Sequence, residues 1–262
     1  MKKKLAFIIL LALICTAQAQ TFETVTIEQA AQQIAVDPQG NIYAVNDATL
    51  YKYAPDGTLL YTYNDNLLGH IASIDVGNPL KIMLFYRDGG CILFLNDKLS
   101  LIGDRVELFP KGLTTISLAT YSTKNELIVY DESNTDLVIL DFYFREKERI
   151  HYDFQEFFPT LLTDVNEKML VMQDPHQGVF FFDNFGTFEK NIAIKSEWPV
   201  QIINDQIIYI KNNQLNSYNY KTLDARIIAD ISDVVGTVRQ VLISHNRMIL
   251  LDEKNIKIIR VQ

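Results

Sequence analysis

One short motif recurs six times along the chain: a polar residue followed by four apolar residues. Its copies lie at residues 41–45, 81–85, 126–130, 168–172, 206–210 and 247–251. Counted between their second residues, successive copies are separated by 40, 45, 42, 38 and 41 residues. An apolar run of this length is typical of a strand buried on both faces, and the near-constant period indicates a repeat architecture.

Each copy has a strand-like segment before it and another after it. The preceding segments are residues 34–36, 71–74, 116–120, 161–164, 200–203 and 238–243. The following segments are residues 50–53, 91–95, 137–142, 178–182, 214–218 and 255–259. A more polar fourth segment closes the first five units, at residues 58–63, 99–108, 148–154, 188–194 and 224–231. The sixth unit lacks one, whereas residues 21–27 alternate like a strand and belong to no unit.

Six four-stranded units predict an all-β, six-bladed β-propeller in which the N-terminal strand completes the last sheet as a "velcro" closure. Radial closure leaves only short, protected sheet edges. Five blades with an appendage and a β-sandwich are the alternatives, and the even spacing favours six blades. We expect residues 20–262 to form this single domain.

The N-terminus has the features of a secretory signal peptide. Three lysines at residues 2–4 precede an apolar run at residues 5–14, and Ala17-Gln18-Ala19 forms a cleavage site of small residues. Because the apolar run is about half as long as a membrane span requires, we predict that residues 1–19 are removed. A retained N-terminal anchor is the alternative.

The two cysteines argue against lipidation and against an internal disulfide. Bacterial lipidation needs a small residue before the modified cysteine, and Cys15 follows Ile14. Removal of residues 1–19 leaves Cys91 as the only cysteine, so no internal disulfide is expected. Cys91 lies in an apolar strand pattern, which predicts an inert core thiol.

Charge and motif content limit the function further. The formal net charge is −8, and it becomes −11 once the three N-terminal lysines are removed. Such an acidic exported chain is a poor candidate for binding nucleic acid or anionic lipid. The four histidines, at residues 70, 151, 176 and 245, match no local metal motif, and no Walker-type, nucleophile-elbow or calcium loop is present. We therefore predict no catalytic residues, no metal and no cofactor.

Aromatic-proline pairs mark three of the predicted links between units. They are Phe109-Pro110, Phe158-Pro159 and Trp198-Pro199, and Phe157 makes the second link especially apolar. In a propeller these links lie on one face of the ring. We predict that Phe109, Phe157, Phe158 and Trp198 form an aromatic patch that contacts a protein partner. Alternatively, each proline starts an inner strand and the aromatic residue fills the gap between blades.

The first unit carries the clearest repeat signature. The turn Asp37-Pro38-Gln39-Gly40-Asn41 precedes its second strand, and a displaced version recurs at residues 75–78. These degenerate repeats, with a signal peptide ending Ala-Gln-Ala-Gln, resemble six-bladed propellers exported to the envelope of Bacteroidota. The resemblance implies a non-enzymatic periplasmic interaction platform, and more specifically an accessory or plug subunit of an outer-membrane export or assembly complex.

Two other functions stay open at this point. A sugar- or peptide-binding propeller would use the same aromatic face for a smaller partner. A propeller hydrolase or lyase would need polar residues near the axis, where the inner strands offer Asp164, Gln201, Arg239 or Gln240, and His70. The fold alone does not choose among these functions.

Overall fold

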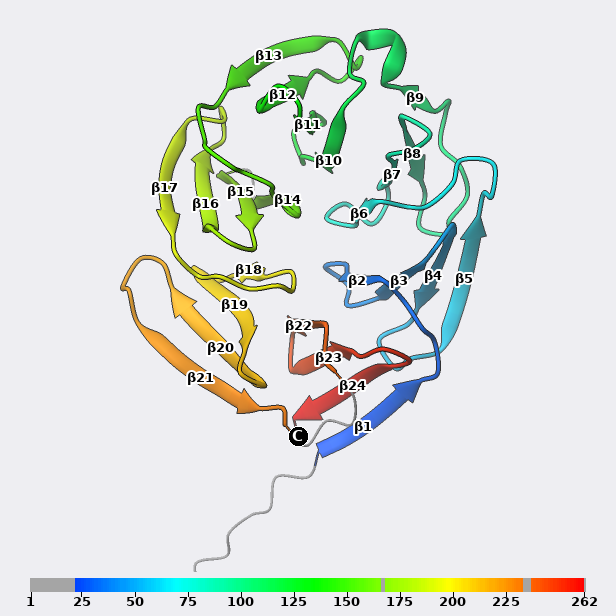
Figure 1. Ribbon diagram of the computed structural model, residues 1–262. Helices are drawn as coiled ribbons and strands as arrows, with labels where there is room; N and C mark the ends of the chain where they lie inside the picture. Colours follow the sequence, from blue (N-terminus) through cyan, green and yellow to red (C-terminus); the bar gives the residue numbers. More distant parts are fainter. Residues whose placement is uncertain (1–21, 166–167, 233–236, 262) are drawn as a thin grey trace, which may run out of the picture.

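The computed structural model describes residues 22–165, 168–232 and 237–261. In these ranges the chain forms six four-stranded antiparallel sheets, arranged as blades around a central axis (Figure 1). The predicted six-bladed β-propeller is therefore confirmed. The predicted signal peptide, residues 1–19, lies outside the described residues.

The strands of each blade follow one another from the axis outward. The innermost strands are β2 (Gln33–Val36), β6 (Ser73–Asp75), β10 (Ile116–Tyr121), β14 (Leu161–Val165), β18 (Gln201–Ile203) and β22 (Gln240–Ser244). The second strands are β3 (Ile42–Asn46), β7 (Ile82–Tyr86), β11 (Leu127–Asp131), β15 (Met169–Asp174), β19 (Gln206–Lys211) and β23 (Arg247–Leu251). The third strands are β4 (Thr49–Tyr53), β8 (Cys91–Leu95), β12 (Asp136–Leu140), β16 (Gly178–Asp183), β20 (Gln214–Asn219) and β24 (Ile256–Val261). The outer strands are β5 (Leu59–Asn64), β9 (Val106–Glu107), β13 (Glu146–His151), β17 (Phe188–Ile192), β21 (Ala225–Asp230) and β1 (Phe22–Ile27).

Strand β1 closes the ring as the sequence predicts. It pairs antiparallel with β24 over six residues, from Phe22 opposite Val261 to Ile27 opposite Ile256. Nearer the axis, a side chain of the sixth blade also bonds to the backbone of the first blade. The Gln240 amide accepts a hydrogen bond from the Ile34 N–H (2.8 Å) and donates one to the Ile34 carbonyl oxygen (2.9 Å). We call this pair of bonds the Gln240 clamp.

The core consists of apolar clusters between neighbouring blades rather than one central core. Strand β7 contributes side chains to two of these clusters. Met83 and Phe85 pack with residues of the third blade, whereas Leu84 and Tyr86 pack with residues of the first. Each of these side chains is fully buried. The uninterrupted apolar run of the motif thus reflects burial on both faces of the second strand.

The outer edge of the second blade differs from the prediction. Residues 99–108 were expected to form a strand, but β9 spans only Val106–Glu107, and Leu101 makes an isolated bridge to Leu95. The strand is interrupted because Leu99 and Gly103 adopt positive φ angles of 58° and 66°, which break extended pairing. Strand β9 is followed by the 3-10 helix η1 (Phe109–Lys111).

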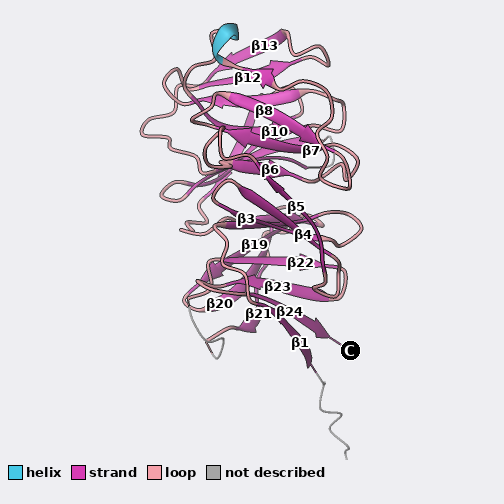
Figure 2. Cartoon of the chain, turned by 90° about the vertical axis from the view of Figure 1, so that its right-hand side faces the viewer, coloured by secondary structure: helices cyan, strands magenta, loops and turns pink. Residues whose placement is uncertain are grey.

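Seen from the side, the turns and links gather on two opposite faces of the ring (Figure 2). Among the described residues, no helix has both the length and the apolar character needed to cross a membrane.

Candidate functional site

The three aromatic-proline pairs lie in links that join the outer strand of one blade to the inner strand of the next. Phe109 begins η1 between β9 and β10, Phe158 lies between β13 and β14, and Trp198 lies between β17 and β18. In an antiparallel blade these links share one face with the turns between the second and third strands. We call this side of the ring the link face.

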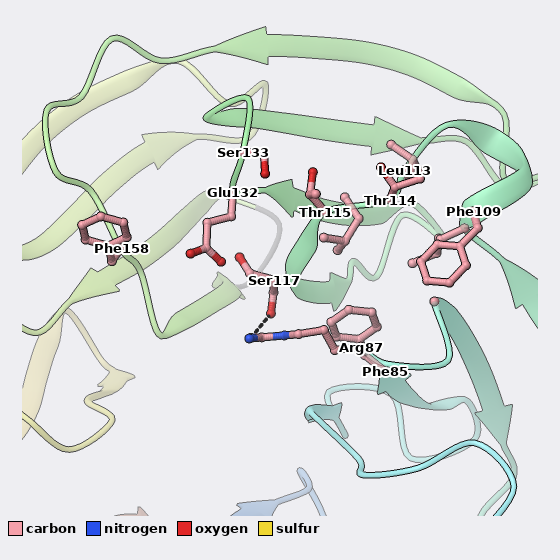
Figure 3. A pocket seen from close by; sticks show the side chains of 13 residues that line it. Phe85, Arg87, Phe109, Leu113, Thr114, Thr115, Ser117, Glu132, Ser133 and Phe158 are labelled. Atoms are coloured by element: carbon pink, nitrogen blue, oxygen red, sulfur yellow. Dashed lines mark hydrogen bonds between the residues drawn. The ribbon is translucent and has the colours of Figure 1, made fainter.

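A cavity of about 400 Å³ lies on the link face, over the second and third blades. Phe109 and Phe158 lie at opposite sides of it, and Arg87, Ser117 and Glu132 lie between them (Figure 3). The Phe109 residue is 46% exposed and Phe158 is 57% exposed. Two of the four predicted aromatic residues therefore line one cavity and present apolar surface to solvent.

Phe109 is positioned by the turn between β7 and β8. Its ring lies directly over Gly90, where an added Cβ would come within 2.3 Å of the ring. Gly90 has a φ of 57°, a conformation that glycine adopts without the strain other residues incur. The Leu108 N–H donates to the Gly90 carbonyl oxygen at 2.8 Å, and the Leu108 side chain is buried. Gly90 thus both permits the turn and leaves room for Phe109.

Phe158 is held by a buried carboxylate at the end of β15. Asp174 is fully buried, and its Oδ2 accepts a hydrogen bond from the Phe158 N–H at 2.7 Å. Its Oδ1 accepts from the N–H groups of His176 and Gln177, at 2.7 and 2.9 Å. One aspartate therefore shapes its own turn and fixes the link that carries Phe158.

Phe157 does not belong to the exposed aromatic surface. It is only 5% exposed, and its ring packs against Phe180 (4.7 Å between centroids) and Tyr130 (5.9 Å). Adjacent residues in the link point in opposite directions, so Phe158 faces the cavity while Phe157 fills the space between the third and fourth blades. For Phe157 the geometry agrees with the gap-filling alternative.

Trp198 lies in the next link and does not line the cavity. It is half-buried, and its carbonyl oxygen accepts hydrogen bonds from Gln173 Nε2 (3.0 Å) and Ser196 Oγ (2.8 Å). The fully buried Gln173 also accepts from the Val200 N–H at 2.8 Å. Hydrogen bonds between the Gln173 side chain of β15 and the backbone of this link therefore hold the link in place.

The polar part of the cavity was not predicted from the sequence. In β10, Ile116 and Leu118 pair with consecutive residues of β11, so Ser117 is the extra residue of a β-bulge. The Ser117 carbonyl oxygen accepts a hydrogen bond from Arg87 Nη2 at 2.6 Å. Ser117 is 4% exposed, and within the described ranges its Oγ has no hydrogen-bond partner. A serine between apolar strand residues carries no sequence signal for a bulge.

Arg87 and Glu132 bring opposite charges to the same cavity without pairing. Arg87 follows β7, and Glu132 follows β11, so they come from the turns of two neighbouring blades. Both residues are exposed, and neither forms an ion pair within the described part of the chain. The backbone of Glu132 is fixed by a hydrogen bond from its N–H to the Thr115 carbonyl oxygen (3.0 Å). The cavity thus presents one cation and one anion to a ligand.

The remaining titratable groups that the sequence singled out lie elsewhere. None of the four histidines lines the cavity. His151 Nδ1 lies 2.9 Å from Asp136 Oδ1, and this hydrogen bond raises the pKa of the exposed imidazole. Cys91 is fully buried, and burial raises the pKa of its thiol to about 11. In the described residues no group of three or more histidine, cysteine or acidic side chains is placed to hold a metal ion.

Comparisons with known proteins identify the fold only. No protein-family model and no curated protein matches this chain. Virginiamycin B lyase from Staphylococcus aureus, in a catalytically inactive H270A form with quinupristin, has a TM-score of 0.61 and 11% identity over 87% of this chain and 80% of its own. YCF48 bound to D1 peptide has a TM-score of 0.56 and 10% identity over 92% of this chain and 97% of its own.

A third similar structure comes from a secretion system. PorZ is described as an essential bacterial surface component of the type-IX secretion system of Porphyromonas gingivalis. It has a TM-score of 0.51 and 14% identity, and the match covers 90% of this chain and 34% of PorZ. At such identities the similarity shows a shared propeller architecture, on which different proteins carry different functions.

Proposed function

We propose that this chain is an exported, non-enzymatic propeller that acts as a protein-interaction platform, and that its link face binds a partner through the cavity between Phe109 and Phe158. The observation that carries the proposal is the exposure of these two phenylalanines on opposite sides of one cavity. Large aromatic side chains that surround a pocket are typical anchors of protein interfaces.

The two rings can supply a useful share of binding energy. Each has roughly 100 Å² of apolar surface that a partner can cover, which corresponds to about 2–3 kcal/mol per ring at about 25 cal/mol per Å². Both are held in place before binding, Phe109 over Gly90 and Phe158 through Asp174. A site fixed in this way loses little conformational entropy when the partner binds.

The cellular setting is part of the proposal. The signal-peptide pattern of residues 1–19 supports export, and the acidic charge, −8 for the full chain and −11 without the three N-terminal lysines, suits a soluble partner-binding protein. The fold shared with PorZ, a surface component of a secretion system, supports a role at the bacterial envelope. We place the protein in the periplasm as an accessory or plug subunit of an outer-membrane export or assembly complex. The fold shared with YCF48, which was solved with a bound peptide, supports recognition of a polypeptide.

The test is affinity recovery of the tagged protein from its own envelope, followed by mass spectrometry. A stoichiometric outer-membrane partner is expected with the native protein and should be lost with the Phe109→Ser/Phe158→Ser double variant. Phe185→Ser is the matched control, because Phe185 is 61% exposed and lies in the turn between β16 and β17, on the opposite face. Thermal unfolding should be cooperative in all variants, which separates loss of binding from loss of fold.

Two results would contradict the proposal. Recovery of the native protein alone, as a clean monomer, excludes a stable complex and directs the search to small ligands. Recovery of the same partner by the double phenylalanine variant shows that the link-face cavity does not carry the interaction.

A further inference from the structure

Arg87 and Glu132 line the cavity and form no ion pair with any residue that the structure describes, and these two charges indicate what kind of segment the cavity accepts. We infer, building on the interaction proposed above, that the cavity binds a short extended peptide segment with one acidic and one basic side chain on the same side. The acidic side chain meets Arg87 and the basic side chain meets Glu132. Apolar residues that flank the charged pair contact Phe109 and Phe158.

Arg87 is suited to a carboxylate because, among the described residues, only one of its side-chain N–H donors has a partner. A guanidinium group carries five N–H donors in a planar fork, and one Nη2 donor is committed to the Ser117 carbonyl oxygen at 2.6 Å. This bond fixes the side chain against the third blade, so the remaining donors are held in place beside the cavity. A fixed guanidinium binds a carboxylate through two parallel hydrogen bonds.

Glu132 supplies the opposite charge from the next blade. Its carboxylate makes no hydrogen bond or ion pair with any described residue, and its backbone is held by the bond to Thr115. The protein as a whole is acidic, which favours approach of a segment that carries a cation. A ligand with only one kind of charge would satisfy one of these two side chains and be repelled by the other.

Ser117 adds a buried polar group to the charged pair. The bulge in β10 places it in the cavity lining between Arg87 and Glu132, where its Oγ has no partner within the described chain (Figure 3). A buried hydroxyl without a partner is rare in folded proteins. Because this Oγ is not accessible to solvent, a bound peptide meets Ser117 only through Arg87, which the Ser117 carbonyl oxygen holds in place.

Cavity size and layout favour an elongated occupant. A volume of about 400 Å³ admits a few side chains and excludes a folded domain, so the partner must insert a short segment. The four side chains that recognise it come from two turns and two links, with the phenylalanines on opposite sides. In an extended strand, side chains two residues apart point to the same side. One strand can therefore present an acidic and a basic residue together, with apolar neighbours beyond them.

The test uses a library of random linear peptides displayed on phage and selected on the purified protein. Selected peptides should share an acidic and a basic residue two positions apart, flanked by aromatic or aliphatic residues. The dominant sequence is then synthesised with a fluorescent label, and its affinity is measured by polarisation. Arg87→Gln and Glu132→Gln should each weaken it about tenfold or more. Arg226→Gln and Glu189→Gln, exposed positions on β21 and β17, are the matched controls and should bind like the native protein.

A double-mutant cycle assigns each charge to its partner. When the acidic residue of the peptide is changed to its amide, Arg87→Gln should have no further effect, and the equivalent change of the basic residue should remove the effect of Glu132→Gln. The inference is overturned if no peptide is selected, if the consensus lacks the charged pair, or if the neutral variants bind like the native protein. Any of these results leaves the wider proposal standing as long as the envelope partner is still lost with the double phenylalanine variant.

Discussion

Replacing Gln240 with methionine tests how much the Gln240 clamp contributes to the stability of the ring. The clamp joins β22 of the sixth blade to β2 of the first, and both of its hydrogen bonds are buried. Methionine is unbranched and similar in length, so it can fill the same space without making either bond. The change leaves the N–H and the carbonyl oxygen of Ile34, a residue only 3% exposed, without the partner they have in the native protein.

The expected cost follows from those two backbone groups. A buried donor or acceptor left without a partner costs about 1–3 kcal/mol, and easier burial of the apolar methionine offsets a part of this. We therefore expect the free energy of unfolding to fall by about 3 kcal/mol. For a domain of this size 1 kcal/mol corresponds to about 2–4 °C, so the Tm should drop by about 6–12 °C.

The chain offers a matched control at the neighbouring junction. Gln201 of β18 makes the same two bonds to Ile243 of β22, at 2.8 and 3.0 Å, but this site is only partly buried. Water can replace the lost bonds there, so Gln201→Met should cost about 1 kcal/mol. The assays are thermal unfolding by calorimetry and urea unfolding with an unchanged m-value. A Gln240→Met variant within about 0.5 kcal/mol of the native protein, or one affected less than Gln201→Met, would refute the reasoning.

Three further predictions concern single side chains. Gly90→Ala should lower the free energy of unfolding by about 1–2 kcal/mol and weaken partner recovery, because the new Cβ meets the Phe109 ring and the φ of 57° becomes strained. Urea unfolding measures the first effect and affinity recovery the second, and native-like behaviour in both would contradict this account. Cys91 should fail to react with a thiol reagent at pH 8 until denaturant is added, because burial raises its pKa to about 11; rapid reaction of the folded protein would show that the strand is accessible. His151 should titrate by NMR above the ordinary value of about 6.5, and Asp136→Asn should lower its pKa again. Since the folded state binds this proton more tightly, the stability gained from the His151–Asp136 pair is complete below the pKa of His151 in the unfolded chain. It disappears as the pH rises through the pKa of His151 in the folded protein. An unshifted His151 pKa would show that the pair makes no such contribution.

The blades could be predicted from the sequence because burial on both faces leaves a clear pattern. The run from Ile82 to Phe85 has to be apolar throughout, since alternate side chains enter different inter-blade clusters. Outer strands such as β9 are harder to predict because one edge and much of their surface face solvent, so few positions are constrained. The positive φ angles at Leu99 and Gly103 that interrupt the outer edge of the second blade follow from local turn chemistry, which leucine does not reveal.

The site was only partly predictable for a different reason. In a strand, neighbouring side chains point to opposite faces, but a link has no fixed period, so the sequence does not show that Phe157 is buried while Phe158 is exposed. The aromatic-proline pairs located the link face, and three-dimensional structure was needed to select Phe109 and Phe158 from it. Arg87 and Glu132 lie 45 residues apart in ordinary turn sequences, and only the packing of neighbouring blades brings them to one cavity.

Ring closure and the cavity lie on opposite sides of the propeller, so stability and binding should respond to different changes. Strand β10, which carries Ser117, lies across the ring from β1 and β24 (Figure 1). Repeated units contact mainly their neighbours, so a defect at the closing junction reaches the cavity only if the ring opens. Gln240→Met should therefore lower the Tm yet recover the partner normally at temperatures where it is folded, whereas Phe109→Ser/Phe158→Ser should lose the partner at a near-native Tm. Loss of the partner by folded Gln240→Met would show that closure and the cavity are coupled, and that the blades do not act independently.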